Sequence, residues 1–150
     1  MSARSEPSGF LMRDSWRTDA VLGRKLELDG GRFAPAKARA WVAELLSERV
    51  YGVDLLDTLV LVSELVTNAV RHGDAGEQET VIVHVALAPD VLRVEVCDQG
   101  PGFTPPAVPK ARKQGGGNGL VMLATMSSSW GVAGDDGTCV WFERVLGLAG

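Results

Sequence analysis

A carboxylate and a carboxamide, those of Glu64 and Asn68, lie one helical turn apart in the segment SELVTNAVRHG, residues 63–73. With about 3.6 residues per turn, positions 64, 68 and 71 fall on one narrow face of a helix. A helix used only for packing would carry Leu or Ala there, because burying polar groups without partners costs roughly 2–7 kcal/mol each. We therefore expect a ligand against this face. A metal-bound phosphate chain is a good candidate, since hard cations prefer oxygen ligands.

A second candidate is Asp98, at the end of the alternating run VLRVEVCD, residues 91–98. Asp98 shares the parity of the apolar residues, so its carboxylate is expected on the core side of a strand. It could simply cap the turn that follows, as Asp often does. Taken together with the helix face, and with Gly100 and Gly102 that let a ring approach the backbone, it is better explained as an acceptor for an exocyclic amine such as that of adenine. Thr138 shares the parity of the apolar residues in the last strand and can add a hydroxyl to the same pocket.

A third candidate is the glycine run QGGGNGL, residues 114–120, which leads into a helix. Free N–H groups and the positive end of the helix dipole suit a phosphate at such a place. The run lacks the Gly-Lys-Ser/Thr ending of a P-loop. Taken alone, it could equally be a linker. The glycines concerned are Gly115, Gly116, Gly117 and Gly119.

Composition limits the classes of function. The chain has 150 residues, 45% of them apolar, which suits one domain with a real core. A net charge of -4 argues against binding nucleic acid through a basic face. No apolar run approaches the roughly 20 residues that span a bilayer, so we expect a soluble cytoplasmic protein. Cys97 and Cys139 are expected to be small buried residues, neither disulfide-bonded nor metal ligands.

The pattern of the chain predicts the elements that position these residues. Residues 1–22 are expected to be a flexible leader that could dock through its aromatic residues. A strand near 25–29 is followed by a helix from Pro35 to about Val50 and a second helix capped by Asp54. A hairpin (79–88 and 91–98), a helix (118–126) and two strands (130–133 and 138–146) complete an α+β sandwich, with helices on one face of a mainly antiparallel sheet. His84 lies opposite in parity to its apolar neighbours and is expected to be exposed.

A family resemblance joins these candidates. The segments SELVTNAVRHG, DQGPGF, GNGL and GTCVWFE resemble, in order and spacing, the four nucleotide-site boxes of the GHKL superfamily of ATPases, which includes gyrase, histidine kinases and MutL. The likeness is closest to the stand-alone anti-sigma factor serine/threonine kinases and covers residues 25–146. It implies a Bergerat-type two-layer α/β sandwich with a mixed, mostly antiparallel sheet, and an ATP-binding domain over residues 23–147.

The resemblance also implies a role for each candidate residue. Glu64 would be the general base, Asn68 the ligand of a Mg²⁺ ion that accompanies ATP, and Asp98 the reader of the adenine amine. The further nucleotide-contacting positions would be Arg71, His72, Gly100, Gly102, Gly115, Gly116, Gly117, Gly119, Leu120 and Thr138.

By the same resemblance the chain would be a homodimeric anti-sigma factor. It would phosphorylate a serine of a STAS-type anti-anti-sigma factor and bind a sigma factor, with no direct contact to nucleic acid or membrane. No phosphoacceptor histidine precedes the first helix, which argues against a complete sensor histidine kinase. Two alternatives stay open: a nucleotide-binding module that sequesters a partner without phosphorylating it, and an ATPase piece of a larger signalling chain.

Overall fold

The computed structural model describes residues 16–72, 80–98, 119–133 and 138–147. Within these residues the side chains of Arg71, His72, Leu120 and Thr138 are not described. The elements, in chain order, are β1 (Leu22–Asp29), α1 (Ala34–Leu46), α2 (Gly52–His72), β2 (Thr80–Leu87), β3 (Val91–Asp98), α3 (Gly119–Met126), β4 (Ser129–Ala133) and β5 (Thr138–Val145). This is the order that the sequence predicts.

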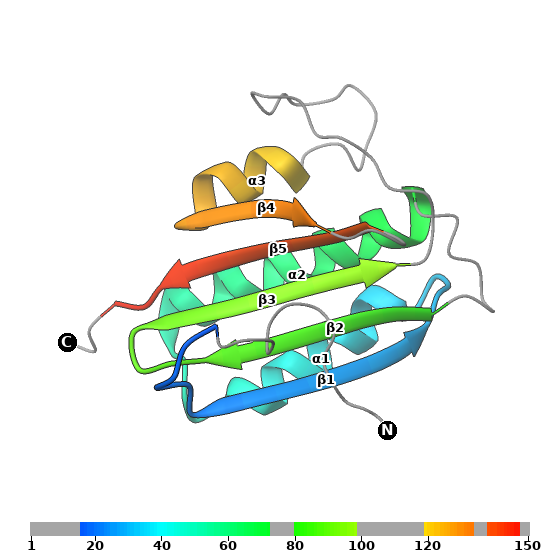
Figure 1. The fold of residues 1–150 in the computed structure, drawn as a ribbon. Coiled ribbons are helices and arrows are strands. Elements are labelled where there is room, and N and C mark those ends of the chain that lie inside the picture. The colour runs from blue at the N-terminus through cyan, green and yellow to red at the C-terminus, as the bar shows by residue number, and fades with distance from the viewer. Residues whose placement is uncertain (1–15, 73–79, 99–118, 134–137, 148–150) are drawn as a thin grey trace.

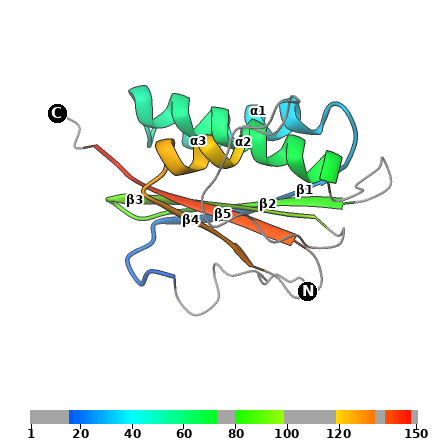
Figure 2. The same ribbon diagram turned by 90° about the horizontal axis from the view of Figure 1, so that it is seen from above.

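The five strands form one sheet in the order β1-β2-β3-β5-β4, and each of the four described pairings is antiparallel. The described helices α1, α2 and α3 cover the same face of this sheet (Figures 1 and 2). The α+β sandwich expected from the sequence is therefore confirmed. α2 lies between α1 and α3, so it is the helix whose two flanks both meet a neighbour (Figure 1).

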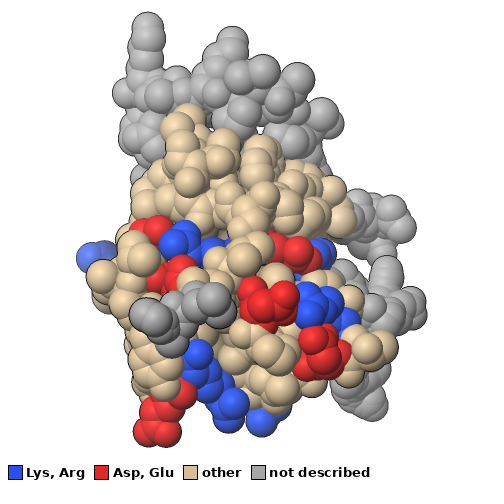
Figure 3. Space-filling model, turned by 90° about the vertical axis from the view of Figure 1, so that its left-hand side faces the viewer, with Lys and Arg blue, Asp and Glu red and all other residues tan. Residues whose placement is uncertain are grey.

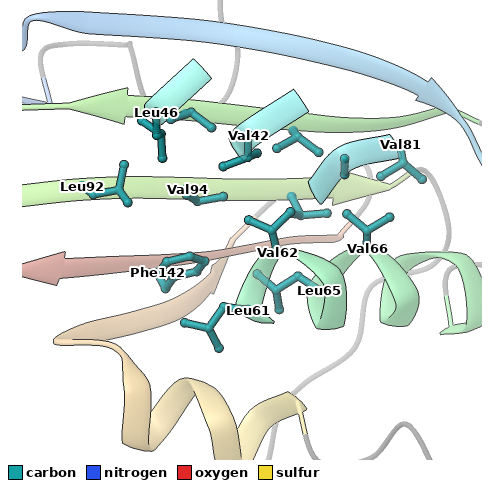
Figure 4. Packing of buried hydrophobic residues seen from close by; sticks show 14 of the residues in the cluster. Val42, Leu46, Leu61, Val62, Leu65, Val66, Val81, Leu92, Val94 and Phe142 are labelled. Atoms are coloured by element: carbon teal, nitrogen blue, oxygen red, sulfur yellow. The ribbon is translucent and has the colours of Figure 1, made fainter. Parts of the chain in front are cut away.

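The core lies between the sheet and the two helices α1 and α2 (Figure 4). α2 buries residues spaced one and four apart, which is the spacing of a single helical face, and these meet the inward-facing residues of β3 and β5. Burying each such side chain contributes about 1.5–3 kcal/mol. The main participants are Leu61, Val62, Leu65, Val66, Val94 and Phe142. The apolar stripe of α2 is thus used for packing, and Glu64 and Asn68 lie outside it.

α1 ends at Leu46, four residues before the predicted end at Val50. The backbone N–H groups of Arg49 and Val50 both donate to the carbonyl of Leu46, at 2.9 and 3.0 Å, and so close a turn. Gly52 then begins α2 with a φ of +62°, a conformation that glycine adopts without steric cost. The chain therefore reverses direction between the two helices in a short connection.

The sequence predicted that Asp54 caps α2. In the structure Asp54 instead lies within the first turn of this helix. Its carboxylate accepts a hydrogen bond from Nε of Arg144 at 2.8 Å and another from the backbone N–H of Gly147 at 2.8 Å. Arg144 also pairs with Asp57 at 2.9 Å and donates to the carbonyl of Met126 at 2.6 Å. Asp54 therefore ties the start of α2 to the end of β5.

The same end of the molecule carries acidic and basic side chains close together (Figure 3). Arg17 pairs with Asp19 at 2.7 Å and with Asp90, in the β2–β3 turn, at 2.9 Å. Trp16 donates from Nε1 to Glu143 at 2.8 Å. The residues just before β1 therefore contact the sheet through an aromatic side chain, as the sequence suggested. These contacts all lie at the end away from Asp98.

The face of the sheet opposite the helices is more enclosed than parity predicts. His84, expected to be exposed, is only 4% exposed, and its cross-strand neighbour Glu95 is 1% exposed. Parity assigns a residue to a face but does not say whether that face is covered, which is why the expectation is wrong. Burial is the main cause that lowers the pKa of His84 to about 4, and the nearby charge of Lys25 lowers it further.

Next to this pair, an aromatic and ionic cluster extends across the same face. The guanidinium of Arg93 lies 4.2 Å from the centre of the Trp141 ring and pairs with Glu143 at 2.7 Å. Gly131 lies directly opposite Trp141 in the adjoining strand. A β-carbon at Gly131 would come within 2.9 Å of that ring, so only glycine leaves it room.

Cys97 and Cys139 form a disulfide, which contradicts the sequence-based expectation that neither would be bonded. The two residues are directly opposed in the antiparallel β3–β5 pair, with their Cα atoms 4.0 Å apart. Opposed positions of such a pair bring side chains close together, and this proximity is what allows the bond. The expectation rested on the number of cysteines, which carries no information about register.

None of the described helices combines the length and apolar character needed to cross a membrane.

Candidate functional site

The candidate residues gather at one end of the molecule. α2 ends, β3 ends and β5 begins at this end, and the first turn of α3 points toward it (Figure 1). The antiparallel pairing of β3 with β5 is the reason that Asp98, the last residue of one strand, lies opposite Thr138, the first residue of the other. Helix face and strand ends are thus brought together from segments distant in sequence.

Glu64 and Asn68 lie on the flank of α2 that faces away from α1. The flank that meets α1 carries Ser63, whose Oγ accepts a hydrogen bond from Nη1 of Arg39 in α1 at 3.0 Å. At about 100° per residue, positions 64 and 68 point to the other side of the helix axis, toward α3. Both side chains are half-buried. The common face predicted from their spacing is therefore present on the described helix.

The carboxamide oxygen of Asn68 is a buried polar atom. Within the described part of the chain this atom, Oδ1, accepts no hydrogen bond. The hydroxyl of Thr67, the preceding residue, donates to the backbone carbonyl of Ser63 at 2.7 Å. A buried acceptor without a donor is costly unless something else binds it. An oxygen atom in that position suits a hard cation.

Asp98 lies at the end of β3 on the helix-facing side, as its parity predicts, and is 9% exposed. A carboxylate in this position can accept a hydrogen bond from an amine that enters from the helix side. The glycine and threonine positions expected to accompany it are only partly described. Thr138 is placed by its backbone, opposite Asp98, whereas its side chain lies outside the described residues.

The remaining predicted positions are placed by their backbone or not at all. Arg71 and His72 are the last two residues of α2, and Gly119 and Leu120 are the first two of α3. The other positions predicted to contact the nucleotide lie outside the described residues: Gly100, Gly102, Gly115, Gly116 and Gly117. Their roles stay predictions.

Sequence reasoning missed the disulfide beside Asp98 and Thr138. Cys97 precedes one of these residues and Cys139 follows the other, and the sulfur atoms lie on the sheet face opposite the helices. Both sulfurs lie within 4.8 Å of a carboxylate oxygen of Glu95. One signal could have revealed the pair. If Asp98 and Thr138 share a pocket across two antiparallel strands, then their neighbours 97 and 139 must also be opposed.

Comparison with known proteins decides the family. A family model described as a histidine kinase-like ATPase domain matches residues 34–144. The chain belongs to this family. The match runs from the start of α1 to near the end of β5, and so includes the α2 face, the end of β3 and the start of β5. The chain therefore has the fold of a histidine kinase-like ATPase domain.

Two solved structures resemble the chain in fold. A crystal structure of the RsbU and RsbW domains of Rv1364c from Mycobacterium tuberculosis is 28% identical, with a TM-score of 0.64. The match covers 83% of this chain and 32% of that one. The histidine kinase domain of a blue-light activated histidine kinase from Erythrobacter litoralis is 20% identical, with a TM-score of 0.51, over 75% of this chain and 59% of that one. A search of curated protein sequences found no match.

Proposed function

We propose that this histidine kinase-like ATPase domain is a Mg-ATP-dependent serine/threonine protein kinase that acts as an anti-sigma factor. The observation that carries the proposal is the buried, unpartnered Oδ1 of Asn68, among the described residues, on the flank of α2 shared with Glu64. Both residues lie within the region that matches the ATPase family. The acceptor suits Mg²⁺, because that ion binds carboxylate and carbonyl oxygens while retaining several waters.

In this proposal the chain's own residues divide the work between binding and proton transfer. Asn68 would hold the metal through Oδ1, and Asp98 would accept a hydrogen bond from the adenine amine. Backbone N–H groups at the start of α3, where the helix dipole is positive, would bind the phosphates. Mg-ATP, when bound, supplies the phosphoryl group. Positioning and charge stabilisation of this kind account for most of the catalysis in phosphoryl transfer.

Glu64 is the proposed general base. It lies one turn before Asn68 on the same flank of α2, so a hydroxyl that enters beside the metal site comes within reach of its carboxylate. Glu64 would accept the proton of a serine hydroxyl placed there. Nucleotide binding alone needs only Asn68 and Asp98. The presence of Glu64 therefore favours a kinase over a silent binding module.

The similarity to the structure of the RsbU and RsbW domains of Rv1364c supports a proposal for the partners. We propose that the phosphoacceptor is a serine of a STAS-type anti-anti-sigma factor and that the chain sequesters a sigma factor when this antagonist is phosphorylated. We further propose a cytoplasmic homodimer, with the ATP-binding domain spanning residues 23–147.

Phosphotransfer by a Glu64→Gln variant tests the proposal. We expect transfer of the γ-phosphoryl group from ATP to a STAS-type partner to fall by about 100-fold or more, because removing a general base typically costs 10²–10⁴-fold. Mg-ATP affinity should change little, since the amide keeps the size of the side chain. Glu44→Gln is the matched control, because Glu44 is exposed on α1, and it should retain native activity.

Two results would contradict the kinase assignment. If Glu64→Gln transferred phosphate at the native rate, Glu64 could not be the base. If the native protein bound Mg-ATP and a sigma factor yet phosphorylated no serine partner, the alternative would hold: a module that sequesters its partner without phosphorylating it.

A further inference from the structure

The disulfide between Cys97 and Cys139 lies immediately beside the pair proposed to hold adenine. In the β3–β5 register, Cys97 faces Cys139 and the next pair is Asp98 facing Thr138. Successive residues of a strand point to opposite faces, so the sulfurs lie on one face of the sheet and Asp98 on the other. The bond therefore acts on the strand ends that carry Asp98 without blocking the side from which a nucleotide would bind.

The disulfide lies where it can restrain the ends of β3 and β5. β3 ends at Asp98 and β5 begins at Thr138, so the disulfide is one residue from the place where the two strands separate. Backbone pairing is weakest at such an end, because fewer neighbouring hydrogen bonds hold it. A covalent bond one residue away limits the relative movement of Asp98 and Thr138.

The rest of the sheet holds the two strands together without the sulfur bond. β3 and β5 pair continuously from Val91 with Val145 to Asp98 with Thr138, and the inward-facing residues Val94 and Phe142 are completely buried. Opening the bond should therefore leave the fold in place. Both cysteines are partly exposed, so a small thiol or disulfide can reach them.

We propose that Cys97 and Cys139 form a reversible thiol–disulfide switch and that the closed disulfide raises affinity for Mg-ATP. This rests on the proposed function, in that Asp98 is taken to bind adenine. With the strand ends tied, less conformational freedom is lost when the nucleotide binds, so binding is stronger. We expect opening of the bond to weaken Mg-ATP affinity by about threefold to tenfold, the size of a modest preorganisation effect.

The oxidant can be a low-molecular-weight disulfide such as glutathione disulfide. The thiolate of one cysteine attacks a sulfur of this oxidant, so a mixed disulfide forms and one glutathione thiolate leaves. The second cysteine then attacks its partner's sulfur in the mixed disulfide, and the second glutathione leaves. The protein loses two electrons and two protons, and the oxidant becomes two thiols. A thiol reductant reverses both steps.

The experiment measures Mg-ATP affinity of the full chain in both redox states. One sample is oxidised with glutathione disulfide and the other is reduced with a phosphine, and a thiol titration confirms the state of each. Mg²⁺ is kept as the only divalent cation, so that no other ion bridges the two thiols and Glu95. Reoxidising the reduced sample tests reversibility, and circular dichroism checks the fold. The double variant Cys97→Ser, Cys139→Ser is the control that cannot respond.

We expect the reduced protein and the double variant to bind Mg-ATP about equally, both more weakly than the oxidised protein, and reoxidation to restore affinity only in the native chain. Equal affinity in both redox states would overturn the switch and leave the proposed function standing. Free thiols that persist after oxidation would also overturn it. Absence of Mg-ATP binding in every form would overturn the proposed function, and the switch with it.

Discussion

The side chain of His84 and the Oδ1 atom of Asn68 are both buried polar groups, and the physical consequences differ between them. The imidazole of His84 can avoid the cost of burying a charge by staying neutral, which is why burial lowers its pKa to about 4. The carboxamide of Asn68 has no such adjustment, since it does not titrate. Its buried Oδ1 needs a donor or a cation. Because of this contrast, we expect Asn68, rather than the buried histidine, to bind a ligand.

The lowered pKa of His84 predicts how stability depends on pH. The unfolded chain binds a proton at this site near pH 6.5, whereas the folded chain does so only near pH 4. The unfolded state therefore binds more protons between these values, and stability falls as the pH falls from about 6.5 to about 4. The contribution from His84 is at most about 3 kcal/mol, at 1.36 kcal/mol per pKa unit.

Urea unfolding of the native protein and of His84→Gln at several pH values measures this contribution. Gln is uncharged and of similar size, so its unfolding free energy should vary less between pH 6.5 and pH 5 than that of the native protein. Carboxylates titrate mostly below this interval and are the same in both proteins. Identical pH dependence in the two proteins would show that His84 is protonated as easily when folded as when unfolded.

At the scale of elements, the tie between α2 and β5 holds the helix that carries the candidate site. Burial of Asp54 raises the pKa of its carboxyl group, but the hydrogen bond from the Gly147 N–H and the charge and hydrogen bond of Arg144 outweigh this, so that its pKa lies below the ordinary value. An ionised Asp54 thus stabilises the fold above its unfolded pKa. This contribution is lost as the pH falls through the lowered value.

Asp54→Asn should destabilise the protein by about 1.5–3 kcal/mol at neutral pH, the range for hydrogen bonds to a charged group. Asp19→Asn is the control, because its ion pair with Arg17 is exposed and should give no measurable change. Thermal unfolding at pH 7 and at acid pH measures both. A loss for Asp54→Asn that persists undiminished after the carboxylate has been protonated would contradict the ionic origin of the tie.

Element order and faces could be predicted from the sequence because they depend on local periodicity. The alternation in β3 placed Asp98 on the core side, and the spacing in α2 placed Glu64 and Asn68 on one face, and both placements are confirmed. The role of Asp54, the burial of His84 and the disulfide of Cys97 could not be predicted in this way. Each depends on which distant segment lies opposite, and local pattern does not encode cross-strand register or coverage of a face.

At the scale of the whole molecule, the two ends of the sheet have different characters. One end, where Asp54 and Arg17 lie, is held by interspersed charges (Figure 3). The other end brings the last turns of α2 together with Asp98 and Thr138, in a chain that belongs to the histidine kinase-like ATPase family. Ion pairs thus fix the elements at one end, while the ends of the strands and the start of α3 at the other can receive a ligand.

Mg-ATP affinity of the native protein, Asn68→Ala and Asp98→Asn tests the central claim most directly, with Thr67→Ala as the control from the neighbouring position of α2. The hydroxyl of Thr67 is satisfied within the helix, so that substitution should leave affinity unchanged. We predict losses of at least about tenfold for Asn68→Ala and Asp98→Asn, the equivalent of about 1.4 kcal/mol or more, with thermal stability near native. Equal affinity for Mg-ATP in all four proteins would contradict the assignment of this site to a nucleotide.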